Sequence, residues 1–519
     1  MIKLDLPRGF PRLYHWLTSA LVCLLFALFA VMTIEKTTSD YISFPGALVF
    51  ALLAVVLFML FSRFIIDRIS SSYLPLLCIL FGLLFALLAV FSIEYFAVWP
   101  SWDYSWTAYT SSLVGQYQAI PEDILAYFNI YPFNFNVAYY LGLIMRVTDS
   151  SMLGAYAANF FSLMMAFLGL VLTAKDCGGM RLACKAALLC LFTSSLYLYM
   201  PIAYTDTLAL PYPIWSCYFA NRALHTQQRQ LRTRILLIAL SGVMGGMAFF
   251  LKAPALIVTL AIAADTLIFP RPVFEAAGKR LRPILQRVLP AFVILAMVAL
   301  SNFGMQGLMR LSGYENCFSY EDSRPPTHWI MMGLNKPVEE GGTSEGWGGY
   351  SRMDDNYTAS IPGYDAKKQA NWNVIQKRLS KMGVGGYLSF LWHKLQYTWA
   401  DGSYYVPTKL ERSPMRITKL HQSILDGGNN SGYRIATQSI QFALLLFVSL
   451  SSLRRLRCPE NTLMRPVALS LLGIILFFSV WETRSRYLLM FLPPIILLAA
   501  DGLNQFNPFA RSSKKRRRF

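Results

Sequence analysis

Two carboxylates and three cations border apolar runs of this sequence, where charged side chains are costly to place. Asp103 lies in WPSWDYSW, a few residues beyond one apolar run, and Asp206 lies in the short polar break PIAYTD. Lys252 separates two apolar runs in FFLKAPAL, and Arg484 and Arg486 precede the last apolar run in WETRSRY. Ionisable groups at the edge of a membrane are often functional. A carboxylate can take a proton from a hydroxyl group, and cations can hold a phosphate.

Structural interpretations of the same residues have to be weighed against these roles. Asp103 follows a long apolar run and could be a solvated helix end, and the aromatic residues around it, such as Trp102, are typical of any membrane interface. Lys252 and the two arginines could extend along apolar surface towards water. The choice depends on the side of the membrane that each residue occupies, and therefore on the topology.

The composition places the chain in a membrane. Its 519 residues are 55% hydrophobic and only 14% charged, and the mean hydropathy is +0.42. Several apolar runs reach the roughly 20 residues that span a bilayer. The net charge of +19 comes from short basic clusters between apolar runs, a pattern that orients membrane proteins rather than one that binds nucleic acid. We therefore predict an all-α polytopic membrane protein with no nucleic-acid partner.

Positive charge orients the apolar runs. A thirteenth, shorter run at residues 132–147 would put two basic loops outside if it crossed, so we expect it to lie flat as an interfacial helix. This gives about 12 transmembrane helices with both termini cytoplasmic. The predicted crossings are residues 14–34, 46–66, 72–92, 152–174, 183–203, 205–220, 235–251, 253–270, 288–308, 433–453, 464–481 and 484–502. The basic segments that fall inside are residues 175–185, 221–234, 271–287, 453–465 and 514–518.

The same topology puts the carboxylates, the three cations and a long polar loop on the extracytoplasmic side. Residues 365–382 of that loop, and the run YLSFLWHKLQYTW after them, have helical spacing, so the loop is expected to be a folded domain with mixed structure. The predicted units are residues 1–71 with two extra N-terminal helices, 72–308 with the catalytic membrane core and the outer loop 94–150, 309–432 with the extracytoplasmic domain, 433–502 with the C-terminal helices, and the basic cytoplasmic tail 503–519.

These charges and aromatic residues suit the transfer of a sugar from a polyprenyl-phosphate carrier. The cations would hold the lipid phosphate, a carboxylate would take the proton of the acceptor hydroxyl, and aromatic faces would pack against the sugar. Such an enzyme needs no nucleotide-binding loop, and the sequence has neither GxxxxGK[ST] nor a GxGxxG motif after a strand pattern.

In order and sidedness the motifs resemble the C-type glycosyltransferases, in particular the branch of the protein O-mannosyltransferases and the lipid A aminoarabinose transferase. In that superfamily the first outer loop carries an acidic residue, and interfacial helices begin at a YPP-like motif, here NIYPFNFN. The resembling positions of this sequence are Asp103, Tyr131, Asp206, Lys252, Arg486 and Tyr487. The resemblance covers roughly residues 74–500. Asp103 is followed by Tyr104 where the family often has a second acid, which bears on the acceptor more than on the reaction class.

The resemblance implies a hexosyltransferase that moves a sugar from a polyprenyl-phosphate-linked donor to an envelope glycan or a protein hydroxyl. Asp103 would be the base, and Asp206 would support it. Binding of the lipid phosphate would fall to Lys252, Arg484, Arg486 and Tyr487. Candidates for contact with sugar or acceptor are Trp102, Tyr131, His328, Trp329, Trp347, His393 and Lys394. Some relatives use a divalent metal at the two acids, so a metal stays open, and no other cofactor is expected.

Two other functions remain as alternatives. A polymerase or ligase of lipid-linked glycans would also use a large outer loop with arginine and histidine, but it would not need Asp103. A transporter of polyprenyl lipids would be expected to carry ionisable residues near the middle of the membrane, whereas here nearly all of them lie at the ends of apolar runs. The short basic tail fits a bacterial plasma membrane, with the active site on the extracytoplasmic face.

Overall fold

The computed structural model describes residues 9–148, 150–226, 230–269, 282–314, 320–337, 346–425, 431–457 and 463–505. The predicted basic tail lies outside the described residues from residue 506 onwards, as does most of the predicted basic loop at 271–287. Within the described ranges every regular element is a helix, and an isolated β-bridge joins Val98 to Pro414. The prediction of an all-α membrane protein is confirmed.

Eight helical segments of the described chain are long and apolar enough to cross a membrane, and two apolar segments are shorter. All twelve predicted crossings fall largely on helices. The long helix α7 bends at Gly178 and Gly179 and contains parts of two predicted crossings. These helices are α1 (Phe10–Asp40), α2 (Phe44–Phe61), α3 (Leu74–Phe96), α7 (Met152–Phe192), α10 (Pro211–His225), α11 (Leu231–Leu251), α12 (Ile257–Ile268), α13 (Arg282–Leu311), α19 (Ser431–Arg457), α20 (Met464–Val480) and α21 (Leu492–Gln505).

The remaining helices belong to loops and turns. The stretch after α3 forms α4 (Asp103–Gly115), α5 (Glu122–Ile130) and α6 (Pro132–Met145), so the predicted helix at 132–147 exists. The long loop forms α14 (Pro326–Met332), α15 (Arg352–Ala359), α16 (Tyr364–Trp399), α17 (Val406–Leu410) and α18 (Lys419–Leu425). Short turns form η1 (Ser62–Ile66), α8 (Ser195–Leu198), α9 (Thr205–Leu208), η2 (Ala253–Leu256) and η3 (Ser485–Phe491).

Proline marks the start of many of these helices. Pro45 begins α2, Pro75 begins α3 and Pro132 begins α6, each within the first two helical positions. Proline is favoured there because the missing N–H would have no partner inside the helix, and the fixed φ angle is already helical. The starts of α2, α3 and α6 therefore follow from the positions of these prolines.

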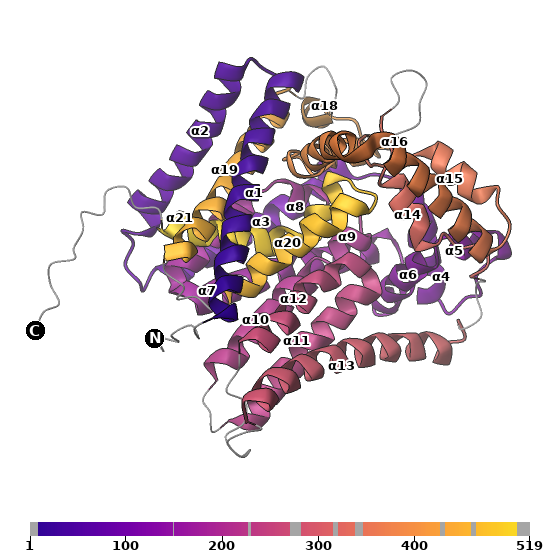
Figure 1. Cartoon of the computed structure of the whole chain (residues 1–519), viewed down its shortest axis with the longest axis horizontal. Coiled ribbons are helices and arrows are strands. Elements are labelled where there is room, and N and C mark those ends of the chain that lie inside the picture. The colour runs from indigo at the N-terminus through magenta and orange to yellow at the C-terminus, as the bar shows by residue number, and fades with distance from the viewer. Residues whose placement is uncertain are drawn as a thin grey trace, which may run out of the picture.

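The last span is the centre of the helix assembly. In its most apolar window 89% of the residues are buried, against 28% in α2 and α3 and 17% in α13. α21 packs against α19 and α7, and α19 packs against α1 (Figure 1). The outlying α2, α3 and α13 expose large apolar side chains such as Leu53, Leu83 and Phe292. Because such continuous apolar surface is unfavourable in water, we assign these faces to lipid.

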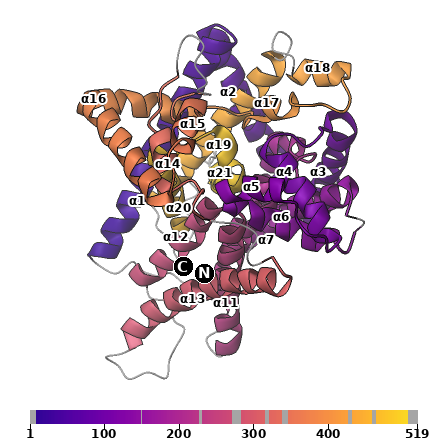
Figure 2. The ribbon, with the colours of Figure 1, turned by 90° about the vertical axis from the view of Figure 1, so that its right-hand side faces the viewer.

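The helices of the long loop gather at one end of the molecule, opposite the start of α11 (Figures 1 and 2). α16 is interrupted at Gly383, where φ is 59°, so the two predicted helical runs are confirmed with a break between them. Met331, Leu334, Ile375 and Phe390 form a separate small core of this region. The loop is thus a helical domain with its own apolar centre.

A buried ion pair joins two of the shorter apolar helices. Nε of Arg465 on α20 lies 2.7 Å from Oδ1 of Asp265 on α12, and the two side chains are 6% and 0% exposed. Breaking such a pair leaves an uncompensated charge in the interior. We therefore expect Asp265→Ala to lower the free energy of unfolding by about 3–5 kcal/mol. The melting temperature of the purified protein in detergent measures this loss.

A second variant and a surface pair serve as controls. The double variant Asp265→Ala with Arg465→Met removes both charges, so it should regain much of the lost stability. The pair of Glu94 and Arg416 is 62% exposed on both sides, so Glu94→Gln should shift the melting temperature only slightly. Equal losses in Glu94→Gln and Asp265→Ala would contradict the argument.

Candidate active site

Asp206 is held in a buried turn where three elements meet. The hydroxyl of Thr207 donates a hydrogen bond of 2.9 Å to the carbonyl of Ile202 and closes the turn before α9. The Asp206 side chain, only 4% exposed, forms ion pairs with Lys252 and Arg486. Lys252 follows the end of α11, and Arg486 lies in η3 with its Nε 3.3 Å from Oδ2 of Asp206. The structure therefore brings Asp206 together with two cations, Lys252 and Arg486, that lie far from it in the sequence.

The charges of this centre stabilise one another. Burial by itself raises the pKa of Asp206, but the positive charges of Lys252 and Arg486 outweigh burial and hold that pKa below its ordinary value. Burial lowers the pKa of Lys252, and the Asp206 carboxylate opposes this shift. A carboxylate held in its ionised form by two cations is a weak proton acceptor. Asp206 is therefore suited to organising charge rather than to removing a proton.

Another acidic residue, Glu482, lies next to this ion centre in the turn before η3. Tyr487 donates a hydrogen bond of 2.8 Å to Oε2 of Glu482, and Nε of Arg484 lies 3.5 Å from Oε1. The Lys252 amine lies 4.4 Å from the centre of the Tyr487 ring, within cation–π distance. Glu482 was not singled out from the sequence, although it stands in the same WETRSRY motif. Its position two residues before Arg484 was the available signal.

Asp103 occupies a different, water-exposed setting. It is the first residue of α4 and follows Trp102, whose φ of 56° turns the chain into the helix. Tyr127 donates a hydrogen bond of 3.1 Å to Oδ1 of Asp103, and the side-chain amide of Asn134 donates one of 2.5 Å to the Tyr127 hydroxyl. The chain of hydrogen bonds fixes the direction of an accessible carboxylate. Sequence reasoning did not identify Tyr127 or Asn134.

Tyr204 lies within electrostatic reach of both Asp103 and Asp206. It lies in the turn before Asp206, and its ring centre is 6.4 Å from that of Tyr104 on α4. Burial raises the pKa of Tyr204 well above its ordinary value, and the negative charges of Asp103 and Asp206 add to the effect. Both carboxylates therefore lie within electrostatic reach of one buried tyrosine, which joins the exposed acid to the buried ion centre.

Residues 401–416 form a strap across this region. At one end Oδ2 of Asp401 accepts a hydrogen bond of 2.6 Å from the Ser485 hydroxyl, next to Arg484. At the other end the backbone N–H of Trp99 donates to the carbonyl of Ser413 at 2.8 Å. The guanidinium of Arg412 lies 4.8 Å from the ring centre of Trp102. Nothing in the sequence pattern indicated that this segment crosses the site.

Tyr131 faces a small polar cluster of the loop domain. Its hydroxyl donates a hydrogen bond of 3.3 Å to Oδ1 of Asp355, which also accepts one of 2.8 Å from Nε of Arg324. Nε2 of His328 lies 3.7 Å from the same oxygen, and the Trp329 ring centre is 6.2 Å from that of Tyr131. Three predicted contact residues, Tyr131, His328 and Trp329, thus lie together, joined to α15 through Asp355.

The other predicted contact residues pack inside the loop domain. Trp347 stacks on His393 with ring centres 4.4 Å apart, and it also contacts Phe390. The buried amine of Lys394 donates to the carbonyls of Gly333 at 2.6 Å, Trp481 at 2.8 Å and Ser479 at 3.2 Å. Lys394 therefore fastens the loop domain to the end of α20, beside Glu482.

The acids do not form a recognisable metal site. In the part of the chain that the structure describes, no group of three or more histidine, cysteine, aspartate or glutamate side chains converges as metal ligands would. Asp206 is bonded to two cations, whereas a hard metal ion needs several oxygen ligands. We therefore derive no chemical step through a metal.

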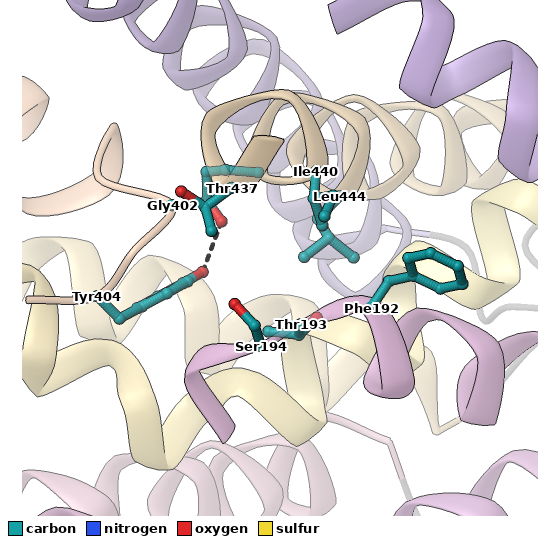
Figure 3. Close-up of a pocket in the computed structure, with 9 residues that line it drawn as sticks. Phe192, Thr193, Ser194, Gly402, Tyr404, Thr437, Ile440 and Leu444 are labelled. Atoms are coloured by element: carbon teal, nitrogen blue, oxygen red, sulfur yellow. Dashed lines mark hydrogen bonds between the residues drawn. The ribbon is translucent and has the colours of Figure 1, made fainter. Parts of the chain in front are cut away.

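A small pocket is lined in part by the strap residues Gly402 and Tyr404. It is bounded by the end of α7, the segment after α16 and α19 (Figure 3). The hydroxyl of Tyr404 donates a hydrogen bond of 2.7 Å to Gln441 at its edge. The empty space there, open solvent included, is about 180 Å³. No substrate role is assigned to it.

Comparisons with known proteins give one family and three structures. A family model described as "conserved hypothetical integral membrane protein" matches residues 13–505. A search of curated proteins finds no match. The Archaeoglobus fulgidus oligosaccharyltransferase in complex with Zn and sulfate has a TM-score of 0.44 and 11% identity over 82% of this chain and 48% of that chain. Its apo form has a TM-score of 0.43 and 12% identity over 84% and 51%.

A third structure is of the same archaeal enzyme, AglB, in complex with an inhibitory peptide and a dolichol-phosphate. It has a TM-score of 0.38 and 11% identity over 83% of this chain and 50% of that chain. The chain spans about half the length of the structures that it matches.

The buried His328 makes stability sensitive to acid. Burial lowers the pKa of His328 from 6.5 to about 4, so between these values the unfolded chain binds a proton that the folded chain does not. The free energy of unfolding should therefore fall as the pH drops from about 6.5 to about 4, by about 3 kcal/mol at most. Melting temperatures of the purified protein at pH 7 and pH 4.5 measure the loss.

His328→Asn isolates this contribution. The asparagine keeps a polar atom near the Thr358 hydroxyl, which lies 2.8 Å from Nδ1 of His328, but it does not titrate. The loss of melting temperature between the two pH values should shrink in this variant. The exposed His225 provides the matched substitution His225→Asn, which should behave as the wild type does. An unchanged acid loss in His328→Asn would refute the assignment.

Proposed function

This chain belongs to the family of conserved hypothetical integral membrane proteins, and we propose that it is a membrane glycosyltransferase. Its donor is a sugar linked to polyprenyl phosphate, and its acceptor is a hydroxyl of a cell-envelope glycan or of a protein. One observation carries the proposal: an exposed carboxylate, Asp103, is oriented by Tyr127 and lies within electrostatic reach of Tyr204, as does the buried ion centre of Asp206 and Arg486. A proton acceptor and a phosphate-stabilising field are the two requirements of this reaction.

The reaction divides between these two parts of the site. Asp103 takes the proton of the acceptor hydroxyl while the oxygen of that hydroxyl attacks the anomeric carbon of the sugar. The bond from that carbon to the phosphate oxygen breaks, and its electron pair remains on the phosphate. Arg484, together with Lys252 and Arg486, stabilises the charge that develops there. Tyr487 supports Lys252 through its ring and holds Glu482 through its hydroxyl.

Aromatic residues around Asp103 suit contact with sugar and acceptor. Trp102 is exposed beside Asp103, and Tyr131 and Trp329 lie together on the neighbouring loop face. Trp347, His393 and Lys394 have structural contacts within the loop domain, so we assign them no contact with substrate. The proposed setting is the extracytoplasmic face of a bacterial plasma membrane, with both termini cytoplasmic, as positive charge orients the helices.

Asp103→Asn tests the base. The amide keeps the size of the carboxylate but cannot take the proton, so transfer should fall by about 10²–10⁴-fold. Lipid analysis of host membranes that contain wild-type or variant protein measures the consequence. We expect one polyprenyl-monophosphate sugar to accumulate in the variant, which would also identify the donor.

Asp123→Asn is the matched control, because Asp123 is an exposed aspartate of α5 in the same stretch. It should leave the lipid pools at wild-type levels, and both variants must insert normally. A build-up of diphosphate-linked oligosaccharide in Asp103→Asn, with monophosphate sugars unchanged, would favour the polymerase or ligase instead. No change in either pool would remove Asp103 from the chemistry.

A further inference from the structure

The strap brings an additional cation to the site. Lys409 is on α17, the short helix in the middle of residues 401–416. One end of the strap is bonded to Ser485 through Asp401, and the other end pairs with the backbone just before Asp103. Arg484 lies between the rings of Tyr350 and Tyr405, 5.5 and 5.6 Å from their centres, and Tyr405 directly precedes α17. The start of α17 therefore lies close to Arg484.

Lys409 differs from the other cations of this region in its bonding. Lys252 and Arg486 are paired with Asp206, and Arg484 lies beside Glu482. The amine of Lys409 has neither an ion pair nor a hydrogen bond with any residue of the described ranges. The Lys409 residue as a whole is partly buried. A cation in such a position has unused hydrogen-bond donors, because an ammonium group has three.

The surroundings of Lys409 favour an anion. Three guanidinium groups lie within electrostatic reach of the Lys409 amine: Arg484 from the turn before η3, Arg486 from η3 and Arg412 from the strap. Asp103 from α4 is also within reach. Asp206 on α9 lies within reach as well. Burial and the three guanidinium groups hold the pKa of Lys409 well below its ordinary value, and Asp103 opposes this shift. An arriving anion would relieve that repulsion and favour the charged form of the amine.

We propose that Lys409 binds the phosphate group of the polyprenyl-linked donor, with Arg484 and Arg412 beside it. The inference rests on the proposed function for the identity of the lipid. Besides its electrostatic effect on the phosphate, the ion centre of Lys252, Asp206 and Arg486 then holds the turn before η3 in position. Lys409 supplies the direct contact, because its amine has no ion-pair partner among the described residues, whereas Lys252 and Arg486 are paired with Asp206.

Direct binding of a short polyprenyl phosphate tests the proposal. The probe is farnesyl phosphate, and farnesol, which has the same chain without the phosphate, reports binding of the lipid alone. Lys409→Met should weaken the binding of farnesyl phosphate by about tenfold or more, because a hydrogen bond to a charged group is lost. Its affinity for farnesol should equal that of the wild type. Lys419→Met, at an exposed lysine of α18, is the matched control and should change neither.

The pH dependence separates binding from a merely structural role. Because the pKa of the free Lys409 amine is lowered, phosphate binding is accompanied by proton uptake wherever that amine is neutral, so the affinity of the wild type should fall towards alkaline pH, by up to about tenfold per unit. The probe itself is fully ionised at alkaline pH, because its second pKa is about 6. Lys409→Arg stays charged throughout and should bind with a flatter profile.

Two outcomes would overturn the proposal. One is wild-type affinity for farnesyl phosphate in Lys409→Met, and the other is an equal loss for farnesyl phosphate and farnesol, which would indicate a collapsed site. The proposed function is tested separately, by transfer from polyprenyl-phosphate sugars in the wild type. A wild type that binds farnesyl phosphate through Lys409 but transfers no sugar would retain the phosphate site and refute the glycosyltransferase.

Discussion

The architecture of the site depends on one buried carboxylate, Asp206. Moving a charge from water into a protein interior costs several kcal/mol per ion in order of magnitude, and only close partners offset the cost. Asp206 obtains them from Lys252 and Arg486. The end of α11, the turn before α9 and the start of η3 must therefore meet at one point. Helices that lie far apart in the sequence therefore meet at their ends, and the apolar α21 follows directly after η3.

The loop domain is tied to the same point. The amine of Lys394 donates to carbonyls of Gly333, Ser479 and Trp481, which matches the three donors of a lysine side chain. Gly348 has φ of 67°, and a Cβ atom there would come within 2.7 Å of Cε of Lys394. Only glycine accommodates both the backbone conformation and this close approach. A displacement of the loop domain would therefore be transmitted to Glu482, directly after Trp481.

The sequence predicted the helices better than the site. Apolar runs and positive charge identified the membrane segments, because both signals are local and strong. Asp206, Lys252 and Arg486 were found because charges next to apolar runs are unusual, and the structure brings them together. Their pairing was not predictable, since it depends on how the helix ends meet. Lys409 gave no signal, because a lysine in a polar loop looks like a solvated charge until the fold brings it beside three arginines.

The two predicted acids are suited to different tasks by their surroundings. A carboxylate that is buried between cations keeps its charge and organises the field, but its affinity for a proton is low. A base must be accessible to its substrate and free of such pairing, as Asp103 is, with a single tyrosine hydroxyl to direct it. Placing the base at the water-exposed edge and the cations in the protein interior also strengthens the electrostatic effect of the cations, because attraction to a phosphate grows as the local dielectric falls. In the proposed reaction, the separation of Asp103 from the ion centre would let proton removal and stabilisation of the leaving phosphate occur together, because the base would not be neutralised by the cations.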